Sequence, residues 1–153
     1  MSPHMYAFFR APGPDAVRAA FAAGPALHDP ATAFETLRPV GADPGDVLEL
    51  LDELVLTRPG TDLIDHTVWP SARRPHCFTI PGDPWTTGPW THQLTPTARD
   101  LLAETPTPAL LALRPHGHTP PTPALIALPT LTPLARRAAA AGEQLYYWLE
   151  HEN

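Results

Sequence analysis

The chain has 153 residues, a formal net charge of −6, and ten basic residues that are all arginine. This length is typical of one domain with its own core, so we expect residues 1–153 to form a single globular domain. The absence of lysine excludes enzymes that need a Schiff-base or phosphate-loop lysine. A negative chain without a basic stripe also argues against nucleic-acid binding, because clustered Lys and Arg bind phosphates.

The single cysteine, Cys77, excludes an internal disulfide and a cysteine-based zinc cluster. No stretch approaches the roughly eighteen apolar residues of a membrane span. The segment from Met1 to Pro14 lacks the basic and apolar regions of a signal peptide. We therefore expect a cytoplasmic protein with no cofactor and no membrane partner.

Proline is frequent, with 22 residues, and several prolines directly follow Asp or Thr. An Asp or Thr side chain accepts a hydrogen bond from a free amide at a helix start, and proline lacks the amide that would go unused there. These dipeptides therefore predict helix starts within a folded domain. They are Asp29-Pro30, Asp43-Pro44, Asp83-Pro84, Thr95-Pro96, Thr105-Pro106, Thr107-Pro108, Thr119-Pro120, Thr122-Pro123 and Thr132-Pro133.

The first half of the chain alternates strand-like and helix-like segments. The aromatic segment 4–10 predicts a buried strand, and apolar residues at helical spacing predict a helix over 14–23. The clearest predicted helix spans 44–56, with Asp43 placed to cap it and one apolar face. Segment 63–69 alternates weakly, which is compatible with a strand or a short helix.

In the second half, 76–80 resembles a strand and Thr95-Pro96 opens a further helix. The apolar runs 107–113 and 122–128 nearly repeat each other, and their Thr-Pro starts favour short helices over buried strands. The Thr- and Pro-rich stretch 115–133 is expected to be an ordered loop region.

The last helix is expected to begin at Thr132-Pro133, and Gly142 is placed to end it in the left-handed conformation. The aromatic run 145–149 then favours a closing strand, although one helix through Glu150 also fits the spacing. A strand would turn one phenol of the Tyr146-Tyr147 pair to the core and the other to the surface.

The fold class follows from these elements. Two aromatic strands from opposite ends of the chain would lie side by side in one small sheet, and about four helices would cover it. The sequence therefore predicts an α+β domain.

Two histidines form a candidate metal site. His116 and His118 are two residues apart, so both imidazoles can reach one ion from a strand or tight loop. The alternative is an exposed connector, and the flanking spacing matches no known zinc pattern. A third ligand would have to come from His76, His92, Asp65 or His66.

A Gly- and Pro-rich loop carries a second candidate site. Trp85 and Trp90, together with Trp69, would line a pocket for a small molecule. His92 would act there as general acid/base, with Asp83 as its orienting carboxylate. The alternative is that the indoles fill the base of the loop, as large aromatic side chains commonly do.

Two adjacent pairs are less suited to catalysis. Asp65 and His66 are neighbours, so a regular strand would turn their side chains to opposite sides. Cys77 beside His76 has the same defect, and the alternative for Cys77 is a small core residue.

Several segments together resemble one group of proteins. The aromatic N-terminal strand is followed by a leucine-rich helix over 47–55, by a Gly88-Pro89-Trp90 turn into a helix, and by a closing segment over 135–149. The matching residues of that closing segment are Arg136-Arg137, Ala141-Gly142-Glu143, Leu145-Tyr146 and Trp148. This pattern resembles uncharacterised actinobacterial proteins and is more distantly similar to YfbM-like domains. The resemblance implies a small α+β fold and no particular activity; residues 106–133 depart from it.

Our first functional hypothesis is a non-catalytic accessory or immunity-type protein that acts through a protein partner. The acidic charge and the lack of a complete catalytic constellation favour it. The proline-stiffened stretch 115–133 would also lose little entropy on docking.

Two alternatives stay open, so the sequence does not decide whether the protein is an enzyme. One is a small enzyme or small-molecule-binding protein of actinobacterial secondary metabolism, which would use the Trp-lined pocket and His92. The other is a metal-dependent hydrolase that acts through His116 and His118.

Overall fold

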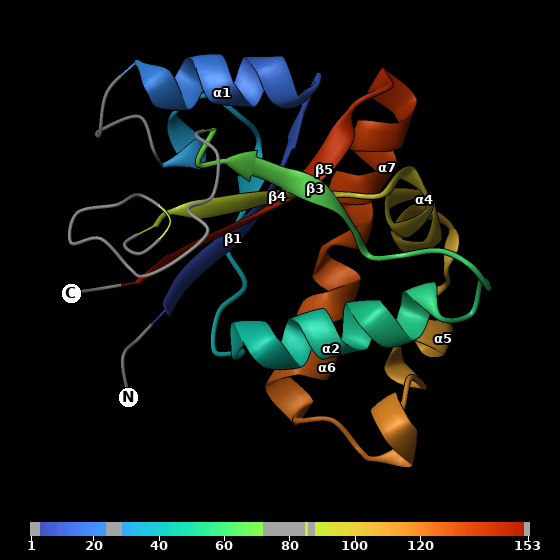
Figure 1. The fold of residues 1–153 in the computed structure, drawn as a ribbon. Helices are drawn as coiled ribbons and strands as arrows, with labels where there is room; N and C mark the ends of the chain where they lie inside the picture. Colours follow the sequence, from blue (N-terminus) through green and yellow to red (C-terminus); the bar gives the residue numbers. More distant parts are fainter. Residues whose placement is uncertain (1–3, 24–28, 72–84, 86–87, 152–153) are drawn as a thin grey trace.

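A single five-stranded antiparallel sheet forms the centre of the molecule (Figure 1). The computed structural model describes residues 4–23, 29–71, 85 and 88–151. The strand order is β2-β1-β5-β4-β3. The strands are β1 (His4–Ala11), β2 (Thr36–Leu37), β3 (Ile64–Trp69), β4 (Trp90–Leu94) and β5 (Gln144–His151).

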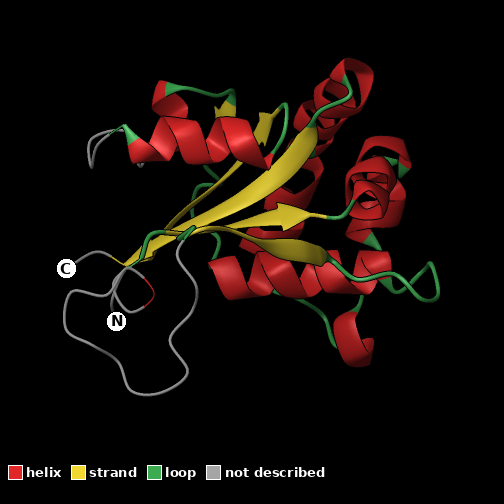
Figure 2. Cartoon of the chain, turned by 45° about the horizontal axis from the view of Figure 1, so that its top comes forward, coloured by secondary structure: helices red, strands yellow, loops and turns green. Residues whose placement is uncertain are grey.

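Helices pack on both faces of this sheet (Figure 2). Helix α1 covers one face, and the other helices gather on the opposite face. This arrangement confirms the predicted α+β class. The α-helices of the described ranges are α1 (Pro14–Ala22), α2 (Pro44–Val55), α4 (Pro96–Glu104), α5 (Thr107–Leu111), α6 (Thr122–Thr130) and α7 (Thr132–Ala141). Short 3₁₀ turns, η2 (Pro30–Thr32) and η3 (Pro115–Gly117), lie between them.

The two aromatic end segments are neighbouring strands, as predicted. β1 and β5 pair antiparallel along their full lengths, from His4 opposite His151 to Ala11 opposite Gln144. The segment 63–69 is a strand rather than a short helix. The segment 76–80 and the Asp83-Pro84 dipeptide lie outside the described residues.

Strand alternation divides the sheet's side chains between two cores. Tyr6, Phe8 and Tyr147 belong to the core beneath α2, α4, α6 and α7, whereas Phe9 and Tyr146 belong to the core beneath α1. Both phenols of the Tyr146-Tyr147 pair are therefore buried. The expectation that one would face the surface is wrong, because helices cover both faces of the sheet.

Three of the predicted helix caps are present. Asp43 Oδ1 accepts a hydrogen bond from Gly45 N at 2.8 Å at the start of α2, and Thr95 Oγ1 accepts one from Ala98 N at 3.2 Å at the start of α4. Asp29 caps η2 in the same way. In each case proline is the next residue, where no amide is needed.

Three other Thr-Pro dipeptides start helices in a different way. Thr107, Thr122 and Thr132 are the first helical residues of α5, α6 and α7, and the proline takes the second position. No side chain caps these helices. Proline still fits, because the first four amides of a helix have no intrahelical partner. The remaining two predictions are wrong, because Thr105 follows the end of α4 and Thr119-Pro120 lies in the loop before α6.

Much of the stretch 115–133, expected as a loop region, is helical. Helix α6 spans Thr122–Thr130 and buries Ala124, Ala127 and Leu128. The run 122–128 is thus a helix, as its Thr-Pro start predicts, and the described part of the chain holds more helices than the four expected. The free energy gained by burying the apolar residues of 122–128 exceeds the preference of the surrounding Thr and Pro residues for turns.

Gly142 ends α7 in the left-handed conformation, with φ 68° and ψ 25°. Glu143 N donates to Ala138 O at 2.8 Å, which closes the helix and directs the chain into β5. A Cβ at Gly142 would meet no atom within 4 Å, so the positive φ is the constraint on this residue.

Gly142→Ala is expected to lower the free energy of unfolding by about 1 kcal/mol, because an L-residue is strained in the left-handed region. Urea denaturation measures this change. The matched comparison is Gly142→Asn, because Asn adopts the left-handed region more readily than Ala and therefore should cost less stability at the same residue. Equal stability of the two variants would contradict the interpretation of Gly142.

Leu50→Ala is expected to lower the free energy of unfolding by about 2–5 kcal/mol. Leu50 of α2 is completely buried in the larger core, where truncation leaves a cavity. Ile126→Ala on α6 is the control, because its side chain is 63% exposed and its loss should change stability by less than about 0.5 kcal/mol. A small effect of Leu50→Ala in urea denaturation would contradict the described packing.

Candidate ligand-binding cavity

A cavity of about 440 Å³ opens between α2 and the strands β3, β4 and β5. Its aliphatic wall comes from Leu48, Leu63, Ile64 and Leu149. Its polar groups come from Asp52, Thr67, His92 and Tyr147. Mostly apolar walls with a few polar groups are typical of small-molecule sites, and the volume lies within their usual range.

Strand pairing places three of the polar groups in one row. Thr67 of β3 is opposite His92 of β4, and His92 is opposite Tyr147 of β5. Register shifts occur in β3 between Ile64 and His66 and again between Thr67 and Trp69. These bulges determine which β3 residue faces the cavity, because each bulge changes the alternation of side chains.

His92 is held by its neighbours on both sides. Its Nδ1 lies 2.9 Å from Thr67 Oγ1, and its ring is nearly parallel to that of Tyr147, with centroids 6.3 Å apart. Burial lowers the pKa of His92, so the imidazole is neutral at neutral pH. The hydrogen bond to Thr67 leaves Nε2 as the donor or acceptor available to a ligand, depending on the tautomer.

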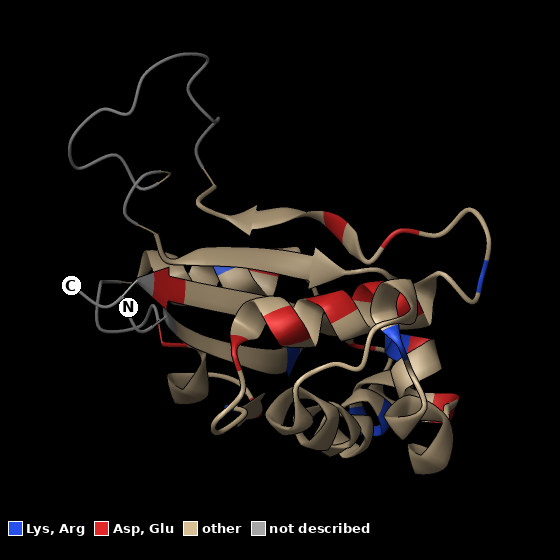
Figure 3. Ribbon diagram, turned by 90° about the horizontal axis from the view of Figure 1, so that it is seen from below, with Lys and Arg blue, Asp and Glu red and all other residues tan. Residues whose placement is uncertain are grey.

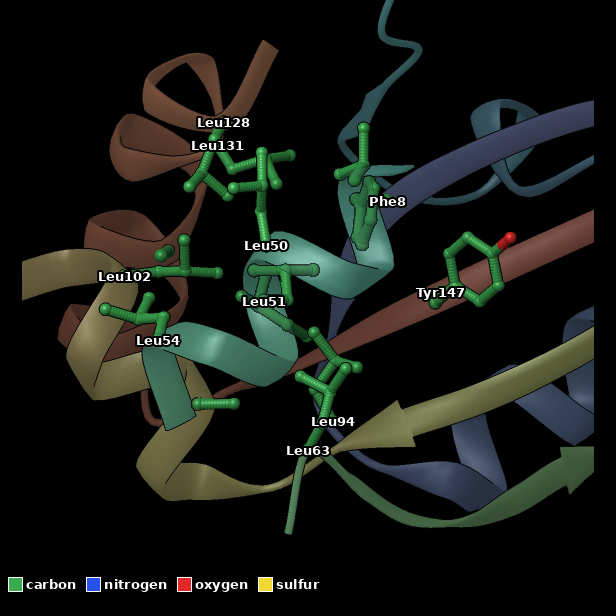
Figure 4. Close-up of a cluster of buried hydrophobic side chains, with 14 of the residues drawn as sticks. Phe8, Leu50, Leu51, Leu54, Leu63, Leu94, Leu102, Leu128, Leu131 and Tyr147 are labelled. Carbon is green, nitrogen blue, oxygen red and sulfur yellow. The ribbon is translucent and has the colours of Figure 1, made fainter. Parts of the chain in front are cut away.

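Tyr147 is a buried phenol whose hydroxyl has no hydrogen-bond partner among the described residues, although only 3% of the residue is exposed. Tyr6 and Tyr146 differ from it: Tyr6 Oη donates to Ala42 O and Tyr146 Oη donates to Gln93 Oε1, each at 2.9 Å. The Tyr147 hydroxyl points away from the labelled leucine side chains (Figure 4). Burial raises the pKa of Tyr147, so its hydroxyl keeps its proton.

Asp52 lies on α2 at the margin of the cavity. Burial, and secondarily the charge of Glu49, raises the pKa of its carboxyl group. Asp52 also lines a second cavity of about 290 Å³, which contains His116.

The structure separates the predicted tryptophans from this cavity. Trp69 packs on the α1 side of the sheet, with its ring centroid 5.8 Å from that of Phe21, whereas His92 faces α2. Trp90 Nε1 donates to the backbone oxygen of Trp85 at 3.0 Å. Neither Trp85 nor Trp90 is among the residues that line the cavity, and Asp83 lies outside the described residues.

His92 is thus the predicted site residue that lines the cavity, whereas Thr67 and Tyr147 were not predicted as site residues.

The candidate metal ligands are not gathered in the ranges that the structure describes. His116 lies in η3 and lines the smaller cavity, and His118 is exposed. Within those ranges, no group of three or more His, Cys, Asp or Glu side chains is placed to hold a metal ion. His76 and Cys77 lie outside them.

Asp65 and His66 do contact each other, contrary to the expectation for strand neighbours. His66 Nδ1 lies 3.2 Å from Asp65 Oδ2, because the adjacent bulge disrupts regular alternation. Gln93 Nε2 donates to the same carboxylate oxygen at 3.2 Å. This polar chain lies on the α1 side of β4, so it does not contribute to the cavity.

No family model matches this chain, and neither a curated protein nor a solved structure matches it. The resemblance to YfbM-like domains therefore stays a prediction.

No helix within the described ranges is long and apolar enough to span a bilayer.

The free energy of unfolding is expected to fall as the pH drops from about 7.5 to about 5.5, and His92 contributes to that fall. Below about pH 6.5 the unfolded chain binds a proton on this histidine, whereas the folded protein binds it only at lower pH. His92→Gln should therefore show a shallower dependence in urea denaturation across this range. His118→Gln, at an exposed histidine, controls for the loss of one imidazole. An unchanged slope in His92→Gln would contradict the assignment.

Proposed function

We propose that the protein binds a small, largely apolar molecule in the cavity beneath α2, with a hydroxyl or similar group of that molecule bonded to Tyr147 and His92. The observation that carries this proposal is the Tyr147 hydroxyl, which belongs to a residue that lines the cavity and has no hydrogen-bond partner among the described residues. A phenol hydroxyl can donate one hydrogen bond and accept another. Both are therefore available to a ligand in the cavity.

The walls of the cavity favour an uncharged group at this position. Burial lowers the pKa of His92 and raises that of Tyr147, so both groups are neutral and a charge beside them would lack compensation. A phenol or alcohol fits both groups, because it can donate one hydrogen bond and accept another. The aliphatic side chains of Leu48, Leu63 and Leu149 would then contact the rest of the ligand.

Binding is better supported than acid/base catalysis by His92. The hydrogen-bond partner of His92 is the hydroxyl of Thr67 rather than a carboxylate. The predicted orienting residue, Asp83, lies outside the described residues. The hypothesis of a protein partner stays a prediction, and copurification from cells would test it.

Titration with 4-ethylphenol and with ethylbenzene tests the proposal. We expect 4-ethylphenol to bind more tightly, because only it carries a hydroxyl for Tyr147 and His92. Calorimetry gives the affinity, and the aromatic NMR resonances of Tyr147 and His92 report the position of the ligand. Tyr147→Phe should weaken 4-ethylphenol binding by about 2- to 10-fold, which corresponds to one hydrogen bond.

Tyr146→Phe is the matched control, because it removes the neighbouring hydroxyl, which bonds to Gln93 on the opposite face. This variant is expected to lose some stability and to keep the wild-type affinity for 4-ethylphenol. Failure of 4-ethylphenol to bind to the wild-type protein would contradict the proposal. Equal affinity of the wild-type protein and Tyr147→Phe for 4-ethylphenol would contradict it as well.

A further inference from the structure

The polar row of the proposed binding cavity lies between two aliphatic ends. Thr67, His92 and Tyr147 are paired across β3, β4 and β5, so they lie at one level of the sheet. Leu149, two residues beyond Tyr147 on the same face, lines the cavity on one side of this row. Ile64 of β3 lines it on the other side. The cavity therefore extends along the strands in both directions from its polar groups.

The register of the strands determines how far each aliphatic end lies from the row. Leu149 is opposite Trp90, which is two residues before His92. Ile64 is opposite Leu94, which is two residues after His92. Two residues of a strand span about 7 Å, so the two ends are about 14 Å apart with the row midway between them. The cavity is thus elongated parallel to the strands, with its hydrogen-bonding groups near the middle.

Helix α2 covers the cavity along its length. Tyr6 is opposite Leu149 and donates to the backbone oxygen of Ala42, two residues before α2, so the helix begins near the Leu149 end. Leu48, in the first half of α2, adds an aliphatic side chain to the wall. Leu63, which directly precedes β3, adds another at the opposite end. Both ends of the cavity are therefore suited to apolar parts of a ligand.

The floor of the cavity carries no charge. Neither β4 nor the segment 144–149 of β5 contains a charged residue, whereas acidic residues follow one another along α2 (Figure 3). Among the described residues that line the cavity, Asp52 has the only carboxyl group, and this residue is exposed. Burial of a charged group at either aliphatic end would be costly, so uncharged arms are favoured.

The position of the polar row defines a ligand class. We propose that the ligand carries its hydroxyl group near the middle of an elongated apolar skeleton, with one arm directed to Leu149 and the other to Ile64. This inference rests on the proposed function, in which Tyr147 and His92 bind the hydroxyl. A molecule with a terminal hydroxyl would either leave one aliphatic end without contacts or move its hydroxyl away from Tyr147. A secondary alcohol with two arms of similar length avoids both losses.

Nonan-5-ol and nonan-1-ol test the inference, because they contain the same atoms and differ in the position of the hydroxyl. We expect nonan-5-ol to bind about 3- to 10-fold more tightly, a factor that corresponds to one hydrogen bond. Its hydroxyl can reach Tyr147 and His92 while both arms contact aliphatic side chains. Calorimetry, by displacement of 4-ethylphenol, gives both affinities.

Tyr147→Phe should reduce the preference for nonan-5-ol to about twofold or less, because it removes a hydroxyl that binds the central group. Tyr146→Phe is the matched control and should keep the preference, because the hydroxyl of Tyr146 bonds to Gln93 on the opposite face of the sheet. Circular dichroism and urea denaturation establish that each variant is folded.

A measurement on the wild-type protein does not depend on the folding of any variant. The terminal methyl groups of bound nonan-5-ol should show nuclear Overhauser contacts with the methyl groups of both Leu149 and Ile64, because one arm lies at each end of the cavity. Ile126, which is 63% exposed on α6, is the control side chain and should show no contact.

The outcomes separate this inference from the proposed function. Equal or reversed affinities of the two nonanols, no binding of nonan-5-ol, or methyl contacts with only one of Leu149 and Ile64 would overturn the central position of the hydroxyl. The proposed function would still stand in these cases, provided that Tyr147→Phe weakens 4-ethylphenol binding. If 4-ethylphenol does not bind to the wild-type protein, the proposed function and this inference both fail. A preference for nonan-5-ol that Tyr147→Phe loses and Tyr146→Phe keeps supports both.

Discussion

Eight consecutive residue pairs join β1 to β5, and they bring the two ends of the chain together in the middle of the sheet. Within the described residues, β2 pairs with β1 alone, and β4 pairs with β5 on one side and with the edge strand β3 on the other. The pairing of β1 with β5 therefore joins the β2-β1 half of the sheet to the β5-β4-β3 half. Its side chains also contribute to both hydrophobic cores. Contacts so distant in sequence carry a loop-closure penalty. Burial of aromatic side chains on both faces of the two strands offsets it.

The neighbouring residues Tyr146 and Tyr147 of β5 lie on opposite faces of the sheet and differ in the hydrogen bonding of their hydroxyls. Tyr146 lies beneath α1 and donates to Gln93, whose amide in turn donates to Asp65, so its hydroxyl is satisfied within the sheet. Tyr147 lies on the opposite face beside His92, where its hydroxyl lines the cavity. Because β5 is a central strand paired on both sides, the backbone at Tyr147 is fixed by the sheet. Under the proposed function, preorganisation of this kind would reduce the entropy lost when a ligand binds.

The bulges of β3 decide the composition of the cavity. Thr67 faces His92 across the strand pair, while Trp69 packs against Phe21 on the other side of the sheet. A perfectly alternating strand would place these two residues on the same face. A Trp-lined pocket around His92 is what the sequence suggests, and the register shifts give a cavity lined by aliphatic residues, Thr67 and Tyr147 instead.

Local interactions explain most of what was predictable about the fold. Asp43 and Thr95 cap their helices through bonds to amides two and three residues away, and Gly142 ends α7 through its own φ angle. Patterns of this range are visible in a single sequence. The stretch 115–133 shows where prediction from local sequence fails, because its turn-forming residues predict a loop and its apolar run predicts a helix. Burial against α2 favours the helix α6.

The sequence by itself therefore determined the α+β class, the aromatic end strands and several helix boundaries, since each depends on neighbouring residues or on simple periodicity. Only the tertiary structure decided that His92, Thr67 and Tyr147 lie in one row, and that the hydroxyl of Tyr147 alone among the three described tyrosines has no hydrogen-bond partner within the described residues. The physical reason is that these relations depend on the register between segments far apart in the chain. A shift of one residue in the register of β3 changes which side chain contacts His92. The sequence is the same in either register, so the sequence pattern alone does not reveal which contact forms.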